Sequence, residues 1–210
     1  MKILITAFEP FGGESVNPAR EALLALPVCV QGAQIVKAVI PTVFGEAIDA
    51  ARRAILDHKP DAVLCVGQAG GRADMSIERV GININDARIA DNKGSQPIDQ
   101  HTAPDGPAAY FATLPVKEIS RAMKDGGVPA SISNTAGAFV CNHLMYGVLD
   151  CLARELPGSV GGFIHVPYVP EQAAAKSPSP PSMSLEYITR GLVIALETIV
   201  KHWEANLDGR

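Results

Sequence analysis

Short apolar runs alternate with amphipathic segments along the first third of the chain. The runs at Ile3–Phe8, Gln34–Ile40 and Ala62–Val66 are too short for ordinary helices and contain β-branched residues, which predicts buried strands. The stretch Asn17–Leu24 opens with an asparagine and a proline, which are typical of a helix N-cap and first helical position. A second helix is predicted over Phe44–His58, where apolar residues recur at helical spacing.

The alternation continues after a polar interruption. Val80, Ile82 and Ile84 alternate with polar or small residues, which predicts a half-exposed strand of a hairpin with Arg88 near its turn, followed by a polar loop over 91–107. Helices are then predicted at 114–125, 141–156 and from 184 to about 203, strands at 129–134 and 162–166, and a proline-rich loop at 173–184. We therefore expect one α/β domain over residues 1–210, with three α/β/α layers around a twisted mixed sheet.

The composition is that of an ordinary globular protein, with 47% hydrophobic and 19% charged residues. A net charge of -4 without any cluster of lysine and arginine argues against nucleic acid or an anionic membrane surface as partner. No apolar stretch approaches the roughly 18 residues of a membrane span. The four cysteines are unevenly spaced and include no C-x-x-C pair, so we expect reduced thiols and a cytoplasmic location.

Four polar or glycine-rich loops follow the predicted strands, at Glu9–Asn17, Gly67–Arg72, Asn134–Phe139 and Pro167–Gln172. In open α/β sheets, sites form in the loops beyond the carboxyl ends of the strands. We therefore expect the catalytic and binding residues in or beside these four loops.

Cys141 directly follows the small-residue loop Asn134–Phe139, in the first turn of the predicted helix. The positive end of the helix macrodipole favours a thiolate there, and a thiolate is the nucleophile in covalent catalysis. The other three cysteines, Cys29, Cys65 and Cys151, are interpreted as small buried hydrophobes.

A nucleophilic thiol needs a base. His143 is near in sequence, but residues two apart on a helix do not face each other, so we place it on the helix surface or behind the site. His165 ends an apolar strand, where an α/β site would hold its base. The remaining histidines, His58, His101 and His202, are interpreted as surface residues.

A third group should orient the base, and Glu78, Asp86 and Asp91 are all candidates between which spacing does not choose. Cofactor motifs are weak: the loop Gly67–Arg72 lacks the order of a dinucleotide or P-loop fingerprint, and Cys141 and His143 lack a second ligand pair for zinc. No cofactor or metal is expected.

Several segments together resemble the bacterial pyroglutamyl peptidase I family, also called pyrrolidone-carboxylate peptidases. The stretches that carry the resemblance are Thr6–Gly13, Gly67–Arg72, Glu78–Asn92, Ser133–Met145, Gly161–Gln172 and Pro181–Glu186. The resemblance extends from Ile3 to about Leu196. It departs from the family pattern at Gly81, where alanine is usual, and over Asp74–Ile77.

The resemblance implies a catalytic triad of Cys141 as nucleophile, His165 as base and Glu78 as the acid. It places Arg88 near the nucleophile, as support for the oxyanion. The residues that it implies for substrate binding are Phe8, Phe11 and Phe139 as an aromatic pocket, with Asn17 and Gln68 as polar contacts. It also implies a fold similar to the purine nucleoside phosphorylases, no cofactor and a homotetramer.

The implied substrate is a peptide that begins with pyroglutamate, an uncharged five-membered lactam. An enzyme that grips a free ammonium group has no handle on it, so recognition needs a flat apolar slot with a donor and an acceptor for the lactam edge. Two other functions remain open: a nucleoside phosphorylase or nucleosidase on a similar fold, which would depend on phosphate, and a non-catalytic binding module, in which Cys141 would be buried and unreactive.

Overall fold

The computed structural model describes residues 1–208, so Gly209 and Arg210, the end of the domain expected over 1–210, lie outside the described residues. The strands are β1 (Lys2–Phe8), β2 (Cys29–Val30), β3 (Ala33–Ile40), β4 (Ala62–Gln68), β5 (Met75–Glu78), β6 (Val80–Ile82), β7 (Ala109–Phe111), β8 (Ala130–Ser133) and β9 (Val160–Val166). The helices are α1 (Pro18–Ala25), α2 (Glu46–His58), α3 (Val116–Asp125), α4 (Val140–Glu155), α5 (Pro170–Ala174) and α6 (Leu185–Asp208).

Seven strands form one mixed sheet in the order β2-β3-β1-β4-β9-β5-β8. The central strands β3, β1, β4 and β9 are parallel, whereas β5 runs antiparallel to β9 and parallel to β8. Apolar runs such as β1 and β4 are buried on both faces, as expected for a covered parallel sheet. The predicted mixed α/β sheet is confirmed.

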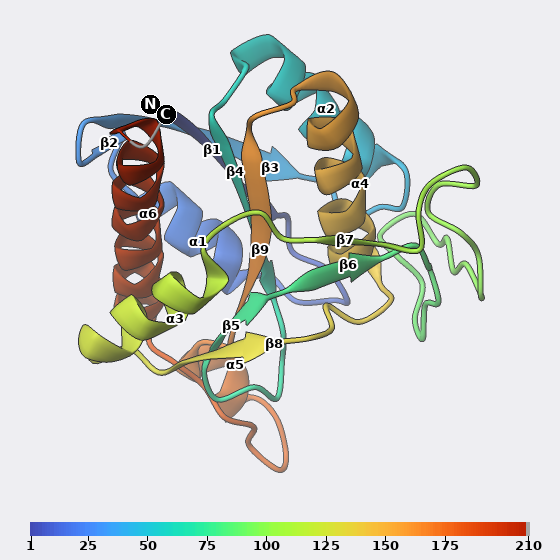
Figure 1. The fold of residues 1–210 in the computed structure, drawn as a ribbon. Helices are drawn as coiled ribbons and strands as arrows, with labels where there is room; N and C mark the ends of the chain where they lie inside the picture. The colour runs from blue at the N-terminus through green and yellow to red at the C-terminus, as the bar shows by residue number, and fades with distance from the viewer. Residues whose placement is uncertain (209–210) are drawn as a thin grey trace.

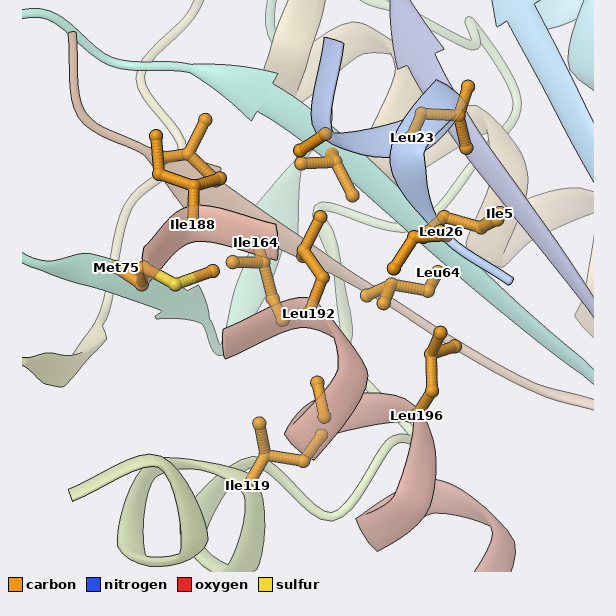
Figure 2. Close-up of a cluster of buried hydrophobic side chains, with 14 of the residues drawn as sticks. Ile5, Leu23, Leu26, Leu64, Met75, Ile119, Ile164, Ile188, Leu192 and Leu196 are labelled. Carbon is orange, nitrogen blue, oxygen red and sulfur yellow. The ribbon is translucent and has the colours of Figure 1, made fainter. Parts of the chain in front are cut away.

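Helices cover both faces of this sheet (Figure 1), so the predicted three layers are confirmed. Side chains of α1, α3 and α6 pack on one face, and Figure 2 shows Ile5, Leu64 and Ile164 of the sheet facing this layer with Leu192 and Leu196 of α6. On the opposite face, α2 and α4 pack on a second apolar cluster. Within residues 1–208, no helix combines the length and apolarity needed to cross a membrane.

The strand at Val80–Ile82 pairs differently from the predicted hairpin with a turn near Arg88. β6 pairs antiparallel with β7, so the connection between them spans residues 83–108. Inside this connection, Asn83 Oδ1 accepts a hydrogen bond from Ala103 N at 2.8 Å, and the backbones of Asn85 and Gln100 form an isolated antiparallel bridge.

Three other elements were not predicted. The two-residue strand β2 precedes β3, and the one-turn helix α5 begins at Pro170 and takes in the start of the predicted loop at 173–184. The third, β5, is a sheet strand with all four side chains buried, and it ends on Glu78.

Candidate active site

Cys141, His165 and Glu78 are brought to one face of the sheet, the face covered by α4. Phe163 of β9 belongs to the apolar cluster on this face, and His165, two residues later, points the same way because strand side chains alternate. In the adjacent strand, Ile77 and Ile164 pair and face the other layer, which leaves Glu78 on the side of His165.

His165 and Glu78 form a short buried contact. The imidazole Nδ1 donates to Glu78 Oε1 at 2.7 Å, and the two side chains are 4% and 0% exposed. This bond fixes the tautomer, so Nε2 is the nitrogen free to accept a proton. The ring of Phe163 packs on the imidazole with 4.8 Å between centroids.

Cys141 lies in the first turn of α4, as predicted, and its side chain is half-buried. Its Sγ lies above the end of β4: a β-carbon added to Gly67 would be 3.0 Å from the sulfur. Gly67 is the register partner of His165 in the neighbouring parallel strand. The thiol therefore lies over the strand pair that carries the imidazole.

The helix start was expected to favour a thiolate, but the surroundings favour a neutral thiol and a neutral imidazole at rest. Burial, with a smaller contribution from the Glu78 carboxylate, raises the pKa of the Cys141 thiol to about 12, although Arg72 opposes the rise. Partial exposure and the helix N-terminus limit this increase. Burial also lowers the pKa of His165, while Glu78 acts in the opposite direction. Burial acts to raise the pKa of Glu78, but the contacts with His165, Ser133 and Arg72 together outweigh burial and lower the pKa, so the carboxylate stays ionised.

Arg72 contacts the acid of the predicted triad. Arg72 Nη1 donates to Glu78 Oε1 at 2.7 Å, a contact that no sequence pattern predicted. Arg88 is exposed and lies on the connection 83–108, which is joined to the loop before Cys141 by a hydrogen bond from Asp86 N to Ala138 O at 2.9 Å.

The aromatic residues implied for the substrate pocket fall into two groups. Phe11 and Phe139 adjoin each other with 6.2 Å between ring centroids, and both are half-buried. Phe8 is buried and packs on Phe163 at 6.5 Å. Phe44, which was not predicted as a pocket residue, meets Phe139 edge-on at 5.5 Å and extends the first group.

Asn17 and Gln68, the implied polar contacts, are buried and already hold the site loops in place. Asn17 Oδ1 accepts from Ala19 N at 3.0 Å as the predicted N-cap of α1, and its Nδ2 donates to Glu9 O at 3.2 Å. Gln68 Oε1 accepts from Gln172 Nε2 at 3.2 Å. Gln172 also donates to Val16 O at 3.2 Å, so it joins two of the loops expected around the site.

The two residues that follow Cys141 hold β6 and the start of the connection 83–108 against α4; these segments are called the wall of the site. The buried Asn142 accepts from Ile82 N and donates to the carbonyls of Ile82 and Ile84, each at 2.9 Å. His143 is only 5% exposed, so the helix surface, one of its two expected places, is wrong; its ring packs on Phe44 with 5.2 Å between centroids. The role of Asn142 was not predicted. Its position inside a helix could have indicated it, because asparagine is unfavourable in a helix interior without a hydrogen-bond partner.

The remaining cysteines differ in part from their interpretation as buried hydrophobes. Cys65 and Cys151 are buried, but Cys29 is exposed because it lies on the short edge strand β2. All four thiols are free. Among residues 1–208, no three histidine, cysteine, aspartate or glutamate side chains are grouped as ligands for a metal ion.

Comparison with known proteins gives matches over nearly the whole chain. The pyroglutamyl peptidase family matches residues 1–202. A pyrrolidone-carboxylate peptidase of Clostridium botulinum is 52% identical over 202 residues, covering 96% of this chain and 94% of the relative, and one of Treponema denticola is 53% identical over 205 residues with the same coverage.

Solved structures agree with the sequence matches. The crystal structure of pyroglutamyl peptidase I from Bacillus amyloliquefaciens has a TM-score of 0.91 and 49% identity, covering 96% of this chain and 97% of that one. A mutant pyrrolidone carboxyl peptidase from Pyrococcus furiosus has a TM-score of 0.93 and 42% identity, covering 96% and 99%. These matches confirm the predicted function over the nucleoside phosphorylase and binding-module alternatives. The chain belongs to the pyroglutamyl peptidase family.

Proposed function

We propose that this chain hydrolyses the bond after an N-terminal pyroglutamyl residue of peptides, with Cys141 as nucleophile, His165 as general base and acid, and Glu78 as the group that orients His165. The observation that carries these roles is the 2.7 Å contact between His165 Nδ1 and buried Glu78, on the sheet face over which Cys141 Sγ lies. Base and orienting acid are thereby in the relation that thiol and serine hydrolases use.

Acylation begins with a neutral pair. As Cys141 Sγ attacks the pyroglutamyl carbonyl carbon, the thiol proton moves to His165 Nε2, and the negative charge of the Glu78 carboxylate stabilises the imidazolium. The carbonyl oxygen becomes an oxyanion that accepts a hydrogen bond from the backbone N–H of Cys141 at the start of α4, with Arg88 as additional support.

The tetrahedral intermediate then collapses. Its C–N bond breaks, His165 returns the proton to the departing amine, and the shortened peptide leaves a pyroglutamyl thioester on Cys141. In deacylation, water gives a proton to His165 and attacks the thioester carbonyl. Breaking the C–S bond releases pyroglutamate and returns the proton to the sulfur.

The lactam ring is assigned to the aromatic slot. Phe11 and Phe139 contribute adjoining, half-buried rings, and Phe8, the third aromatic residue implied for the pocket, forms its buried base against Phe163. The lactam edge hydrogen-bonds to Asn17 and to the Gln68 backbone. The N-cap and carbonyl contacts of Asn17 support this assignment, because they fix where its amide points.

The cellular location and assembly belong to the same proposal. Four free thiols favour the reducing cytoplasm. The homotetramer rests on the family resemblance alone.

The test is release of a fluorophore from a pyroglutamyl amide. We expect Cys141→Ser to fold and to lose activity by on the order of 10³-fold or more, and iodoacetamide to abolish wild-type activity. Cys29→Ser is the matched control, because Cys29 is an exposed thiol on β2, outside the site, and it should leave both activity and its loss on alkylation unchanged. A Cys141→Ser enzyme that keeps most of its activity would refute the assignment.

A further inference from the structure

Arg72 lies beside the proposed triad but has no role in the proposed reaction steps. It ends the glycine-rich loop after β4, and its guanidinium connects two segments of the site. Nη1 donates to Glu78 Oε1 at 2.7 Å, and Nη2 makes a longer contact of 3.4 Å with the carbonyl of Thr135, in the loop that leads to Cys141. The Arg72 side chain is 30% exposed, whereas the Glu78 side chain is 0% exposed.

Arg72 fixes the orientation of the Glu78 carboxylate together with His165 and the Ser133 side chain, which also acts on it. His165 and Arg72 share Oε1, while Oε2 accepts no hydrogen bond from the described residues. One shared oxygen leaves the carboxylate free to turn about its side-chain bond unless a second donor holds it. A buried charge also needs paired donors, and Arg72 supplies the formal positive charge when His165 is neutral.

We propose that Arg72 is a positioning residue of the reaction, which locks the Glu78 carboxylate against His165 and ties it to the loop that presents Cys141. The inference rests on the proposed triad. An arginine suits this role because its planar fork donates in two directions at once, to the carboxylate and to the Thr135 carbonyl. A lysine would supply the charge as a single point without that geometry.

The charge of Arg72 also acts on the whole reacting group. The ionisable groups that face one another here are Glu78 of β5, His165 of β9, Cys141 of α4 and Cys65 of β4, together with Arg72 itself. A nearby cation favours the deprotonated form of each, and Arg72 lowers the pKa of both His165 and Cys141. Loss of the cation therefore raises the pKa of His165 and of Cys141, so both bind their protons at higher pH.

The experiment compares Arg72→Gln and Arg72→Lys in hydrolysis of a pyroglutamyl amide as a function of pH. For Arg72→Gln we expect kcat to fall by between about 10- and 100-fold with little change in KM, and the acidic limb of kcat/KM to move to higher pH. For Arg72→Lys we expect a smaller loss and an acidic limb close to that of the wild type. Arg121→Gln, which removes the same charge from the exposed face of α3 in the opposite layer, is the control and should match the wild type.

A double variant separates positioning from simple destabilisation. If Arg72 acts mainly through Glu78, then Arg72→Gln should cost clearly less in a Glu78→Gln background than in the wild type. Three results would each overturn the inference: losses that add fully in the double variant, an unshifted acidic limb in Arg72→Gln, or wild-type kcat in Arg72→Gln. If Arg72→Gln folds poorly, wild-type kcat in Arg72→Lys would overturn it instead. A wrong triad assignment would be recognised separately, because activity would then survive in Cys141→Ser.

Discussion

At the scale of single residues, His165 is held between opposing influences that set the pH range of the enzyme. Burial lowers its pKa below the ordinary value of 6.5, and the Glu78 carboxylate opposes that shift. A general base must be neutral, so activity should persist until the pH falls through the lowered value. We expect the acidic limb of kcat/KM for pyroglutamyl amide hydrolysis to lie below pH 6.5 in the wild type.

Glu78→Gln should move this limb further down. The substitution removes the group that raises the pKa of His165, so protonation of the imidazole requires still lower pH. The rate at the plateau should fall by about 100-fold or more, because an amide neither fixes the tautomer nor stabilises the imidazolium. The shift is opposite in direction to that expected for Arg72→Gln. An acidic limb that rises in both variants would show that His165 is not the group being titrated.

At the scale of elements, the end of β4 is shaped to admit the nucleophile. Gly67 is buried between two side chains: an added β-carbon would lie 2.7 Å from Phe163 Cζ and 3.0 Å from Cys141 Sγ. Gly67→Ala therefore displaces the thiol or the ring that supports His165. We expect kcat to fall by about 100-fold, since displacements of about 1 Å at a reacting group have effects of this size.

The control for this prediction is Gly162→Ala, on the neighbouring strand β9. Its added β-carbon would meet Leu114 Cδ1 at 3.0 Å, a flexible side chain on the opposite side of the sheet from Cys141. Both variants should lose roughly 1–3 kcal/mol of unfolding free energy, measured in urea, from the extra methyl group. Only Gly67→Ala should lose catalysis. Equal kcat in the two variants would mean that Gly67 has no special relation to the thiol.

The elements differ in how far their sequence predicts them. β1 and β4 are predictable because a covered parallel strand is a continuous apolar run, and α4 because its apolar residues repeat at helical spacing. β5 has no such pattern: it is four residues long, ends on a charge and is buried through its neighbours β8 and β9. The sequence therefore left Glu78 as one of three carboxylates, until the family resemblance chose among them.

The contacts of the site that could not be predicted are those between side chains that are brought together only by the fold. Arg72 and Glu78 are six residues apart, but their contact depends on the turn between β4 and β5, which no local pattern describes. Cys141 and His165 could each be proposed from loop and strand positions, because carboxyl ends of strands and helix starts are recognisable in a sequence, whereas the carboxylates were candidates by composition alone. The mutual distances of these side chains could not be proposed.

At the scale of the whole molecule, one buried histidine joins three segments of the α4 layer. His143 of α4 accepts a hydrogen bond on Nε2 from Gly45 N, at the start of α2, at 2.9 Å. Its Nδ1 lies 3.0 Å from Asn85 Oδ1, which also accepts from Thr102 Oγ1 at 2.9 Å. Helices α2 and α4 and the connection 83–108 therefore meet at an imidazole that must be neutral to accept on Nε2.

This contact should make the stability of the molecule depend on pH. Burial lowers the pKa of His143 to about 4, against 6.5 in an unfolded chain. A depressed folded-state pKa means that the stabilisation is complete above pH 6.5 and is lost as the pH falls from there toward 4, because the unfolded chain binds the proton first. From pH 7 to pH 5, His143 alone should reduce the free energy of unfolding by about 2 kcal/mol.

Urea unfolding of His143→Gln at several pH values isolates this contribution from the carboxylates and from His165, which titrate in both proteins. The variant should be less stable than the wild type at pH 7, because its amide replaces the buried hydrogen bonds imperfectly, and its stability should change less between pH 7 and pH 5. His101→Gln is the matched control, since His101 is exposed on the same connection, and it should keep the wild-type slope. A His143→Gln protein with the full wild-type slope would mean that acid acts on the molecule elsewhere, and that the junction of α2, α4 and the 83–108 connection survives protonation. Because that connection also carries Arg88, loss of the junction below pH 6.5 should loosen the wall of the site before the sheet itself unfolds.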